Sequence, residues 1–173
     1  MVGKRIMILG CCGSGKTTLS NELSGLLDIP VVHLDTLNWR DNWQMVSAEE
    51  FDRQLEQELS KANWIIDGNY SRTIPPRLSK CDTIIYFDYP RPLCLYRVIK
   101  RIILNYGKTR PDMGNNCPER FDWEFLQYVW NFNKENRKQT LEMLSNNKDK
   151  EIVILQNPKQ YKNFLSTIKA TCK

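Results

Sequence analysis

The chain has 173 residues, of which 41% are hydrophobic and 26% are charged, and its formal net charge is +5. These values are those of an ordinary globular protein, so we expect a single domain over residues 1–173 with a sizeable core. No apolar run approaches the roughly 20 residues of a membrane span, and the charge suits anionic ligands without by itself indicating nucleic acid.

The six cysteines, which include the adjacent Cys11 and Cys12, show no spacing typical of a zinc site. Reduced thiols in a cytosolic protein are the simpler interpretation. The first nine residues are too short for a signal peptide, because the glycine at position 10 interrupts the apolar run. We therefore expect a soluble, cytoplasmic protein that has no membrane contact.

Residues 10–17 read GCCGSGKT and match the phosphate-loop pattern of glycine, four residues and Gly-Lys-Thr. Glycines let the backbone form a nest of N–H groups around phosphate oxygens, and Lys16 can reach the β- and γ-phosphates. The Thr17 hydroxyl is suited to bind Mg²⁺. An apolar strand pattern precedes the loop and a helical leucine pattern follows it, so a helix N-terminus points at the anion. We expect ATP to bind Gly10, Cys11, Cys12, Gly13, Ser14, Gly15, Lys16, Thr17 and Thr18.

Downstream of this loop, short apolar runs alternate with helical patterns. Beyond the strand before the loop, strands are expected at residues 29–34, 64–67, 83–87 and 152–155. Ser47 and Glu50 form a capping-box pattern at the start of a helix. Residues 105–121 are rich in Gly, Pro and Asn and are predicted to form a mobile lid without regular structure. An aromatic-rich helix is expected over residues 122–144.

Five strands alternating with helices predict a parallel sheet covered on both faces. The expected fold class is α/β, a three-layer P-loop NTPase fold with a five-stranded parallel sheet, helices on both faces and a small basic lid. In such sheets, ligands bind beyond the carboxyl ends of the strands. Asp35, Asp67 and Asp88 each close an expected strand, so all three are predicted to lie at that edge.

Asp67 is the preferred partner of Mg²⁺ besides Thr17, because a Trp-Ile-Ile run before an aspartate is the usual second half of a phosphate-loop site. The alternative is a strand-end aspartate that merely caps a turn, and Asp88 competes for the metal. Asp35 is predicted to orient or deprotonate an acceptor hydroxyl, with a structural turn as the alternative. His33, the only histidine, is more typical of a structural hydrogen-bonding group than of a base.

Basic residues concentrate between Arg91 and Arg120, where a helical pattern runs into the expected lid. Arg97 and Arg101 lie four residues apart and share a helix face. Guanidinium groups suit phosphate oxygens and the charge that develops during phosphoryl transfer. A solvated helix face followed by a soluble loop is the alternative interpretation.

Several segments resemble a known family. The strings GCCGSGKTTL, IIDGNY and FDYPRPLCLYRVIKR, with the basic lid, resemble the nucleoside-monophosphate-kinase-like family, which includes adenylate kinase. The resemblance implies that Arg97 and Arg101 grip the nucleotide and its phosphates and that Arg110 is a lid arginine. The strings HLDTLNW, WIIDGNYSRT, GKTRPDM and DWEFLQYVWNF are similar to segments of bacterial proteins known as DNA topology modulation proteins, and this similarity runs almost end to end.

The acceptor side departs from the adenylate kinase pattern. After the Asp-Gly pair at positions 67–68 comes Asn-Tyr-Ser-Arg in place of Phe-Pro-Arg, so Arg72 is the candidate replacement for a phosphate-binding arginine. Trp39 and Trp43 are more typical of packing or lid residues than of base-stacking platforms, although they lie where an acceptor would bind. The candidate acceptor site comprises Asp35, Trp39, Asp67, Gly68 and Arg72.

Two functions of different classes fit these features. The first is an ATP-dependent phosphotransferase, a kinase, that uses Mg²⁺ and acts on a nucleotide or another small-molecule acceptor. Its catalytic residues would be Lys16, Asp35, Arg97, Arg101 and Arg110. The second is a nucleic-acid-associated NTPase or a nucleotide-dependent binding protein that affects DNA topology. The chain lacks a long basic arm, a helix-turn-helix pattern and a zinc module, which favours the kinase.

Overall fold

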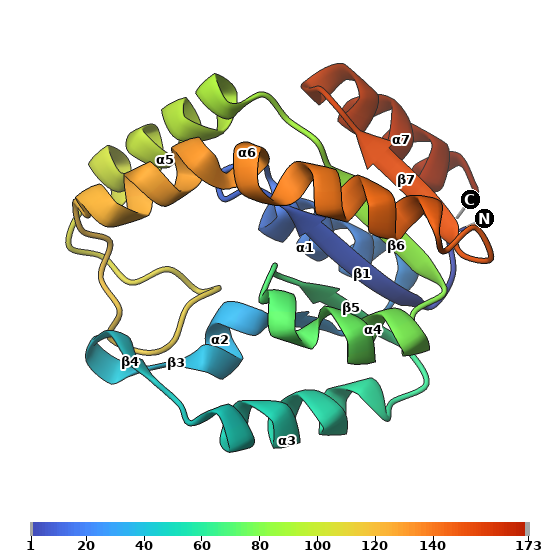
Figure 1. Ribbon diagram of the computed structural model, residues 1–173, viewed down its shortest axis with the longest axis horizontal. Coiled ribbons are helices and arrows are strands. Elements are labelled where there is room, and N and C mark those ends of the chain that lie inside the picture. Colours follow the sequence, from blue (N-terminus) through green and yellow to red (C-terminus); the bar gives the residue numbers. More distant parts are fainter. Residues whose placement is uncertain (1, 172–173) are drawn as a thin grey trace.

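A five-stranded parallel sheet forms the centre of the molecule (Figure 1), for which a computed structural model describes residues 2–171. Its strand order is β2-β5-β1-β6-β7, and each neighbouring pair is parallel. The strands are β1 (Arg5–Gly10), β2 (Val31–His33), β5 (Trp64–Asp67), β6 (Thr83–Phe87) and β7 (Glu151–Leu155). The predicted α/β fold with five parallel strands is confirmed.

Helices cover both faces of this sheet, and in Figure 1 α5 and α7 lie on the opposite side of the strands from α3. Alternate side chains of each strand point to opposite faces. In β1, Ile6 and Ile8 belong to one apolar core, while Met7 and Leu9 belong to the other. The helices are α1 (Lys16–Leu27), α2 (Leu34–Asn38), α3 (Ala48–Leu59), α4 (Ile74–Lys80), α5 (Arg91–Asn105), α6 (Trp123–Ser145) and α7 (Pro158–Thr171).

The segment after the second strand differs from its prediction. Strand β2 ends at His33, and the short helix α2 begins at Leu34, which is fully buried. Asp35 therefore lies in the first turn of a helix and not at the end of a strand. An antiparallel hairpin that the sequence pattern did not predict follows, with strands β3 (Trp39–Arg40) and β4 (Gln44–Met45). The predicted cap of the next helix is confirmed, because the Ser47 hydroxyl accepts a hydrogen bond from the Glu50 N–H at 3.1 Å.

Residues 105–121, the lid segment, follow the end of α5 and contain isolated bridges in place of regular elements. In Figure 1 this segment extends from α5 towards α2 and the β3–β4 hairpin before it returns to α6. The Asn42 N–H donates to the Asn116 carbonyl at 3.0 Å, and the Trp43 Nε1–H donates to the Pro118 carbonyl at 3.2 Å. The lid segment is thus attached to the hairpin across the carboxyl edge of the sheet.

Within residues 2–171, no helix combines the length and the apolar character that crossing a membrane requires. The five cysteines in this range are free thiols, and Cys172 lies outside the described residues.

Candidate functional site

The phosphate loop connects β1 to α1 at the carboxyl edge of the sheet. Gly10, Gly13 and Gly15 all have positive φ angles, which a residue with a Cβ adopts only with strain. At Gly13, an added Cβ would also lie 2.6 Å from the Cys94 carbonyl oxygen. Gly15 caps α1 without a side chain, so no side-chain oxygen accepts from the N–H groups of the first turn. The loop therefore has the backbone geometry of an anion-binding nest.

The Lys16 side chain folds back over this loop. Its Nζ donates to the Gly10 carbonyl at 2.8 Å and to the Cys11 carbonyl at 3.1 Å. The Ser14 hydroxyl is buried and has no hydrogen-bond partner among the described residues. A buried hydroxyl without a partner is costly, so it fits a ligand oxygen better than an empty loop.

Asn69, which sequence reasoning missed, holds the phosphate loop from the loop that follows the neighbouring strand β5. Its Oδ1 accepts from the Gly10 N–H at 3.1 Å, and its Nδ2 donates to the Gly10 carbonyl at 2.9 Å. The fully buried Arg77 donates in turn to the carbonyls of Gly68 and Asn69, at 2.8 and 2.5 Å. The available signal was position, because Asn69 comes directly after the predicted strand-end pair Asp67-Gly68.

Asp67 is 5% exposed, and other side chains engage both of its carboxylate oxygens. The Ser20 hydroxyl donates to Oδ2 at 2.7 Å, and Nδ1 of His33 lies 3.1 Å from each oxygen. Burial opposes a charge on His33, but the hydrogen bond and the negative charge of Asp67 raise its pKa above the usual value. Asp67 thus ties α1 to β2, and it does not line the cavity described below.

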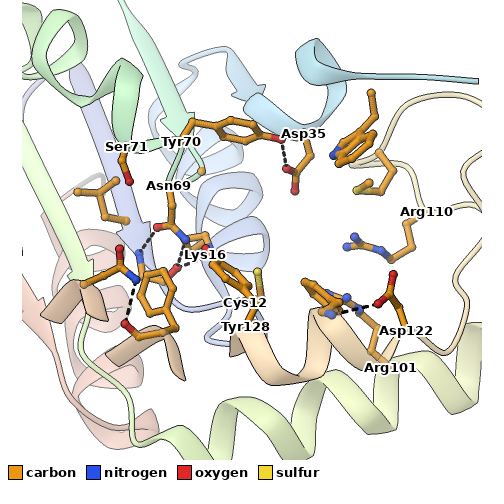
Figure 2. Close-up of a pocket in the computed structure, with 18 of the residues that line it drawn as sticks. Cys12, Lys16, Asp35, Asn69, Tyr70, Ser71, Arg101, Arg110, Asp122 and Tyr128 are labelled. Atoms are coloured by element: carbon orange, nitrogen blue, oxygen red, sulfur yellow. Dashed lines mark hydrogen bonds between the residues drawn. The ribbon is translucent and has the colours of Figure 1, made fainter. Parts of the chain in front are cut away.

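Asp35 and Tyr70 point toward each other on the side of the site opposite Lys16, as Figure 2 shows. The Tyr70 hydroxyl donates to Asp35 Oδ1 at 2.8 Å. Burial raises the pKa of Asp35 above its ordinary value, although the bond from Tyr70 acts in the other direction. A carboxyl group with a raised pKa, held by one hydrogen bond, is suited to accept a proton from an alcohol.

The arginines of α5 and the lid segment meet two buried acids. Nε of Arg101 and Nε of Arg110 lie 2.9 and 2.6 Å from the same oxygen, Oε1 of Glu119. Arg110 also donates to Asp112 Oδ2 at 2.7 Å, and the same oxygen accepts from the Thr17 hydroxyl at 3.2 Å. The lid segment is therefore linked to the phosphate loop through Asp112, another residue to which sequence reasoning gave no role.

A single cavity of about 470 Å³ joins these groups. Figure 2 shows Lys16, Asp35, Tyr128 and Arg110 around it. Aromatic side chains form much of its remaining wall: Trp39, Trp43, Tyr70, Tyr86, Phe125 and Phe132. Of the residues predicted from the sequence, those that line it are Gly10, Cys12, Lys16, Asp35, Trp39, Gly68, Arg101 and Arg110.

Besides Asp67, other residues singled out from the sequence lie outside the cavity lining. Arg72 is exposed and forms an ion pair with Asp52 at 2.5 Å, so it does not line the cavity. Arg97 lies beside the phosphate loop, where its Nη1 donates to the Ser14 carbonyl at 3.1 Å. Asp88, the competing candidate for the metal, binds Arg137 through both carboxylate oxygens.

The residues present fit a nucleotide with its magnesium ion, although they supply few metal ligands. Among residues 2–171, no group of three or more His, Cys, Asp or Glu side chains could hold a metal ion. Mg²⁺ in phosphate-loop proteins takes most of its six oxygens from phosphates and water, so a single hydroxyl such as that of Thr17 is a sufficient anchor.

These features define an α/β phosphate-loop fold, and solved structures share it. One is a shikimate kinase from Acinetobacter baumannii in complex with shikimate, with a TM-score of 0.61 and 18% identity over 95% of this chain and 90% of that one. Another is a shikimate kinase from Bacteroides thetaiotaomicron, with a TM-score of 0.57 and 14% identity over 97% of each chain. No protein-family model matches the sequence, and comparison with curated proteins finds no significant match.

Proposed function

We propose that the protein is an ATP-dependent phosphotransferase that acts on a small-molecule acceptor with Mg²⁺. The observation that carries this proposal is that Lys16 of the phosphate loop and the carboxylate of Asp35 line the same cavity. A triphosphate on the loop would thus point its last phosphate towards a group that can accept a proton. The fold shared with the shikimate kinases agrees with this reaction class.

In this proposal the chain binds the phosphates of ATP, orients the acceptor hydroxyl and neutralises the charge of the phosphoryl group. The backbone of Gly10–Thr18 holds the phosphates, and Lys16, Arg97, Arg101 and Arg110 offset the charge of the phosphoryl group in transfer. Asp35 takes the proton of the acceptor hydroxyl while the hydroxyl oxygen bonds to the γ-phosphorus. The bond between the γ-phosphorus and the β–γ bridging oxygen breaks, and ADP leaves. Thr17 would anchor Mg²⁺, with Asp67 as the second candidate ligand. The bound ion would supply further charge neutralisation at the phosphates.

The lid segment, residues 105–121, would close over the reacting groups and exclude water. On the resemblance to DNA topology modulation proteins, we propose that the chain belongs to that family. We further propose that it forms a single domain and is located in the cytoplasm. A role on DNA is less favoured, because the two lid arginines that line the cavity do not form a free basic surface: Arg110 is paired with Glu119 and Asp112, and Arg120 lies 3.7 Å from Asp122.

The test is transfer of labelled phosphate from ATP to a panel of nucleosides, nucleotides and small alcohols in the presence of Mg²⁺. We expect label in at least one acceptor, with stoichiometric ADP. Label that reaches water alone, at a rate that DNA stimulates, would support the NTPase in place of the kinase.

A further inference from the structure

The acceptor half of the cavity carries a charge pattern that constrains what can bind there. Four cationic side chains line the cavity: Lys16, Arg101, Arg110 and Arg120. Lys16 is bound to the phosphate loop, and Arg101 and Arg110 share the carboxylate of Glu119. Arg120 lies 3.7 Å from Asp122. Each arginine is thus paired with an acid, and the lysine belongs to the donor phosphates.

Asp35 differs, because among the described residues no cation forms an ion pair with its carboxylate, although the positive charges of Lys16 and Arg110 act on it and favour its charged form. Among the described residues, the one hydrogen-bond partner of this carboxylate is the neutral hydroxyl of Tyr70, at 2.8 Å. The arginines nearest in sequence to Tyr70 are also unavailable. Arg72 is paired with Asp52 outside the cavity, and the guanidinium of Arg77 is used by the carbonyls of residues 68, 69 and 73. An anionic group placed here would meet a carboxylate whose neighbouring cations, Lys16 and Arg110, are already engaged by the phosphate loop and by two acids.

The wall of the cavity beside Asp35 is aromatic, and its conformation includes backbone strain at Trp43. The rings of Trp39 and Trp43 form an edge-to-face pair with centroids 5.5 Å apart, and both line the cavity. Trp43 has a φ of 62°, in the left-handed region that bulky residues rarely adopt. Its Nε1–H bond to Pro118 and the Arg120 guanidinium 5.4 Å from its ring centroid hold it there. Strain of this kind concentrates at ligand-binding sites.

We infer that the acceptor is an uncharged alcohol that carries a flat ring, the chemical class to which nucleosides belong, and not a monophosphate or a carboxylate. The inference rests on the proposed kinase function and names the substrate of that same site. The ring packs against Trp39 and Trp43, because aromatic faces bind flat apolar surfaces well. The hydroxyl reaches Asp35, whose raised pKa makes it a stronger base than an ordinary carboxylate.

Matched pairs of acceptors test this inference on the wild-type protein. Labelled ATP and Mg²⁺ are supplied with nucleosides and their 5′-monophosphates, with a pyridine-type aromatic alcohol and its carboxylate analogue, and with an aliphatic polyol. We expect kcat/KM for a ring-bearing neutral alcohol to exceed that of its anionic counterpart by about 100-fold. Comparison of the nucleosides with the pyridine-type alcohol shows which of these two kinds of ring-bearing alcohol the site prefers.

The other outcomes separate this inference from the proposed function. Preference for a monophosphate, a carboxylate or the aliphatic polyol overturns the inference and leaves the kinase function standing. Label that reaches no acceptor overturns the kinase function, and the inference falls with it.

A pair of tryptophan variants tests the role of the wall. Trp43→Leu is expected to raise KM for the ring-bearing acceptor about 10-fold while KM for ATP changes less than about 2-fold. Trp123→Leu, at a tryptophan that is 63% exposed and outside the cavity lining, is the matched control and should change neither. Equal KM values for the acceptor in both variants and the wild type would contradict the assignment of the ring to this wall.

Discussion

The donor and acceptor halves of the cavity are built in different ways. The donor half is a single continuous loop, Gly10–Thr17, whose shape follows from three glycines and whose lysine bonds back onto the same loop. The acceptor half brings together α2, the β3–β4 hairpin, residues 68–71 and the lid segment, which lie far apart in the sequence. The donor half is therefore a local property of the chain, whereas the acceptor half exists only when distant segments meet.

This difference separates general from specific chemistry. A loop that binds phosphates through backbone N–H groups needs few side chains and reads little beyond charge and shape. The acceptor half exposes a carboxylate, a tyrosine and two tryptophans, which in the proposed kinase would distinguish one alcohol from another. Changes in the two halves should therefore separate effects on ATP from effects on the acceptor.

The largest effect is expected from Lys16→Ala. Without its ammonium group the charge of the transferring phosphoryl group is less well compensated, so kcat should fall by roughly 1,000-fold. Steady-state transfer of labelled phosphate and circular dichroism measure the activity and the integrity of the fold. Lys159→Ala, at an exposed lysine on α7, is the matched control. Turnover near the wild-type value in Lys16→Ala would remove the donor half from the proposed reaction.

Asp35→Asn should affect the acceptor half alone. An asparagine keeps an oxygen to accept from the Tyr70 hydroxyl but cannot take the acceptor proton, so kcat should fall about 100-fold. The Kd for ATP, measured by calorimetry, should stay within about 2-fold of the wild type. A loss of ATP affinity as large as the loss of kcat would show that the two halves are not separable.

The same residue predicts two pH dependences with defined signs. Burial raises the pKa of Asp35, so wild-type kcat/KM should fall on acidification at a higher pH than an ordinary carboxylate would cause. The folded state also binds this proton more readily than the unfolded state, so stability declines as pH rises from the unfolded pKa through the folded pKa. Asp35→Asn should therefore gain stability relative to the wild type across that window. Urea denaturation at several pH values measures this difference, and a constant difference would contradict it.

The sequence predicted the donor half better than the acceptor half for a physical reason. The apolar strand, the glycines and Lys16 are consecutive, so their pattern is visible without knowledge of the fold. Asn69 acquires its role only through the parallel register that pairs Ile8 with Asp67. A position directly after the strand-end pair Asp67-Gly68 was the one signal available for it.

Several acceptor features left no local signal at all. The β3–β4 hairpin has strands of only two residues. Its turn places Asn42 and Trp43 in left-handed conformations, which a tryptophan in the sequence does not indicate. Arg72 was the candidate replacement for a phosphate-binding arginine, but it pairs with Asp52, twenty residues away. Glu119 had no role in the sequence analysis, and only the folded lid segment shows that it joins Arg101 to Arg110.

Gly114→Ala is expected to have a smaller effect, because it disturbs the attachment of the lid segment and no reacting group. A Cβ at this position would lie 1.9 Å from the Trp39 carbonyl oxygen, so the lid segment must move away from the hairpin. We expect kcat to fall roughly 10-fold and the ratio of ATP hydrolysis to transfer to rise, because water enters the site. Gly107→Ala is the control, since its Cβ would meet nothing within 4 Å, although its φ of +73° adds local strain. Equal ratios in both variants would show that the contact with Trp39 does not exclude water.

The smallest effect is expected at the boundary between the two halves, where His33 and Ser20 both contact Asp67. The pKa of His33 is raised in the folded state, so its contribution to stability is fully present below the unfolded value near 6.5 and is lost as pH rises through the folded value. His33→Gln keeps a hydrogen-bond donor but removes the charge, and it should cost about 1 kcal/mol at pH 5.5 and less at pH 8.5. Urea denaturation at both pH values measures this cost, with kcat expected to change little. A cost that grows with pH would mean that His33 acts as a neutral group, and Asp67 would then keep an uncompensated charge available for a metal ion.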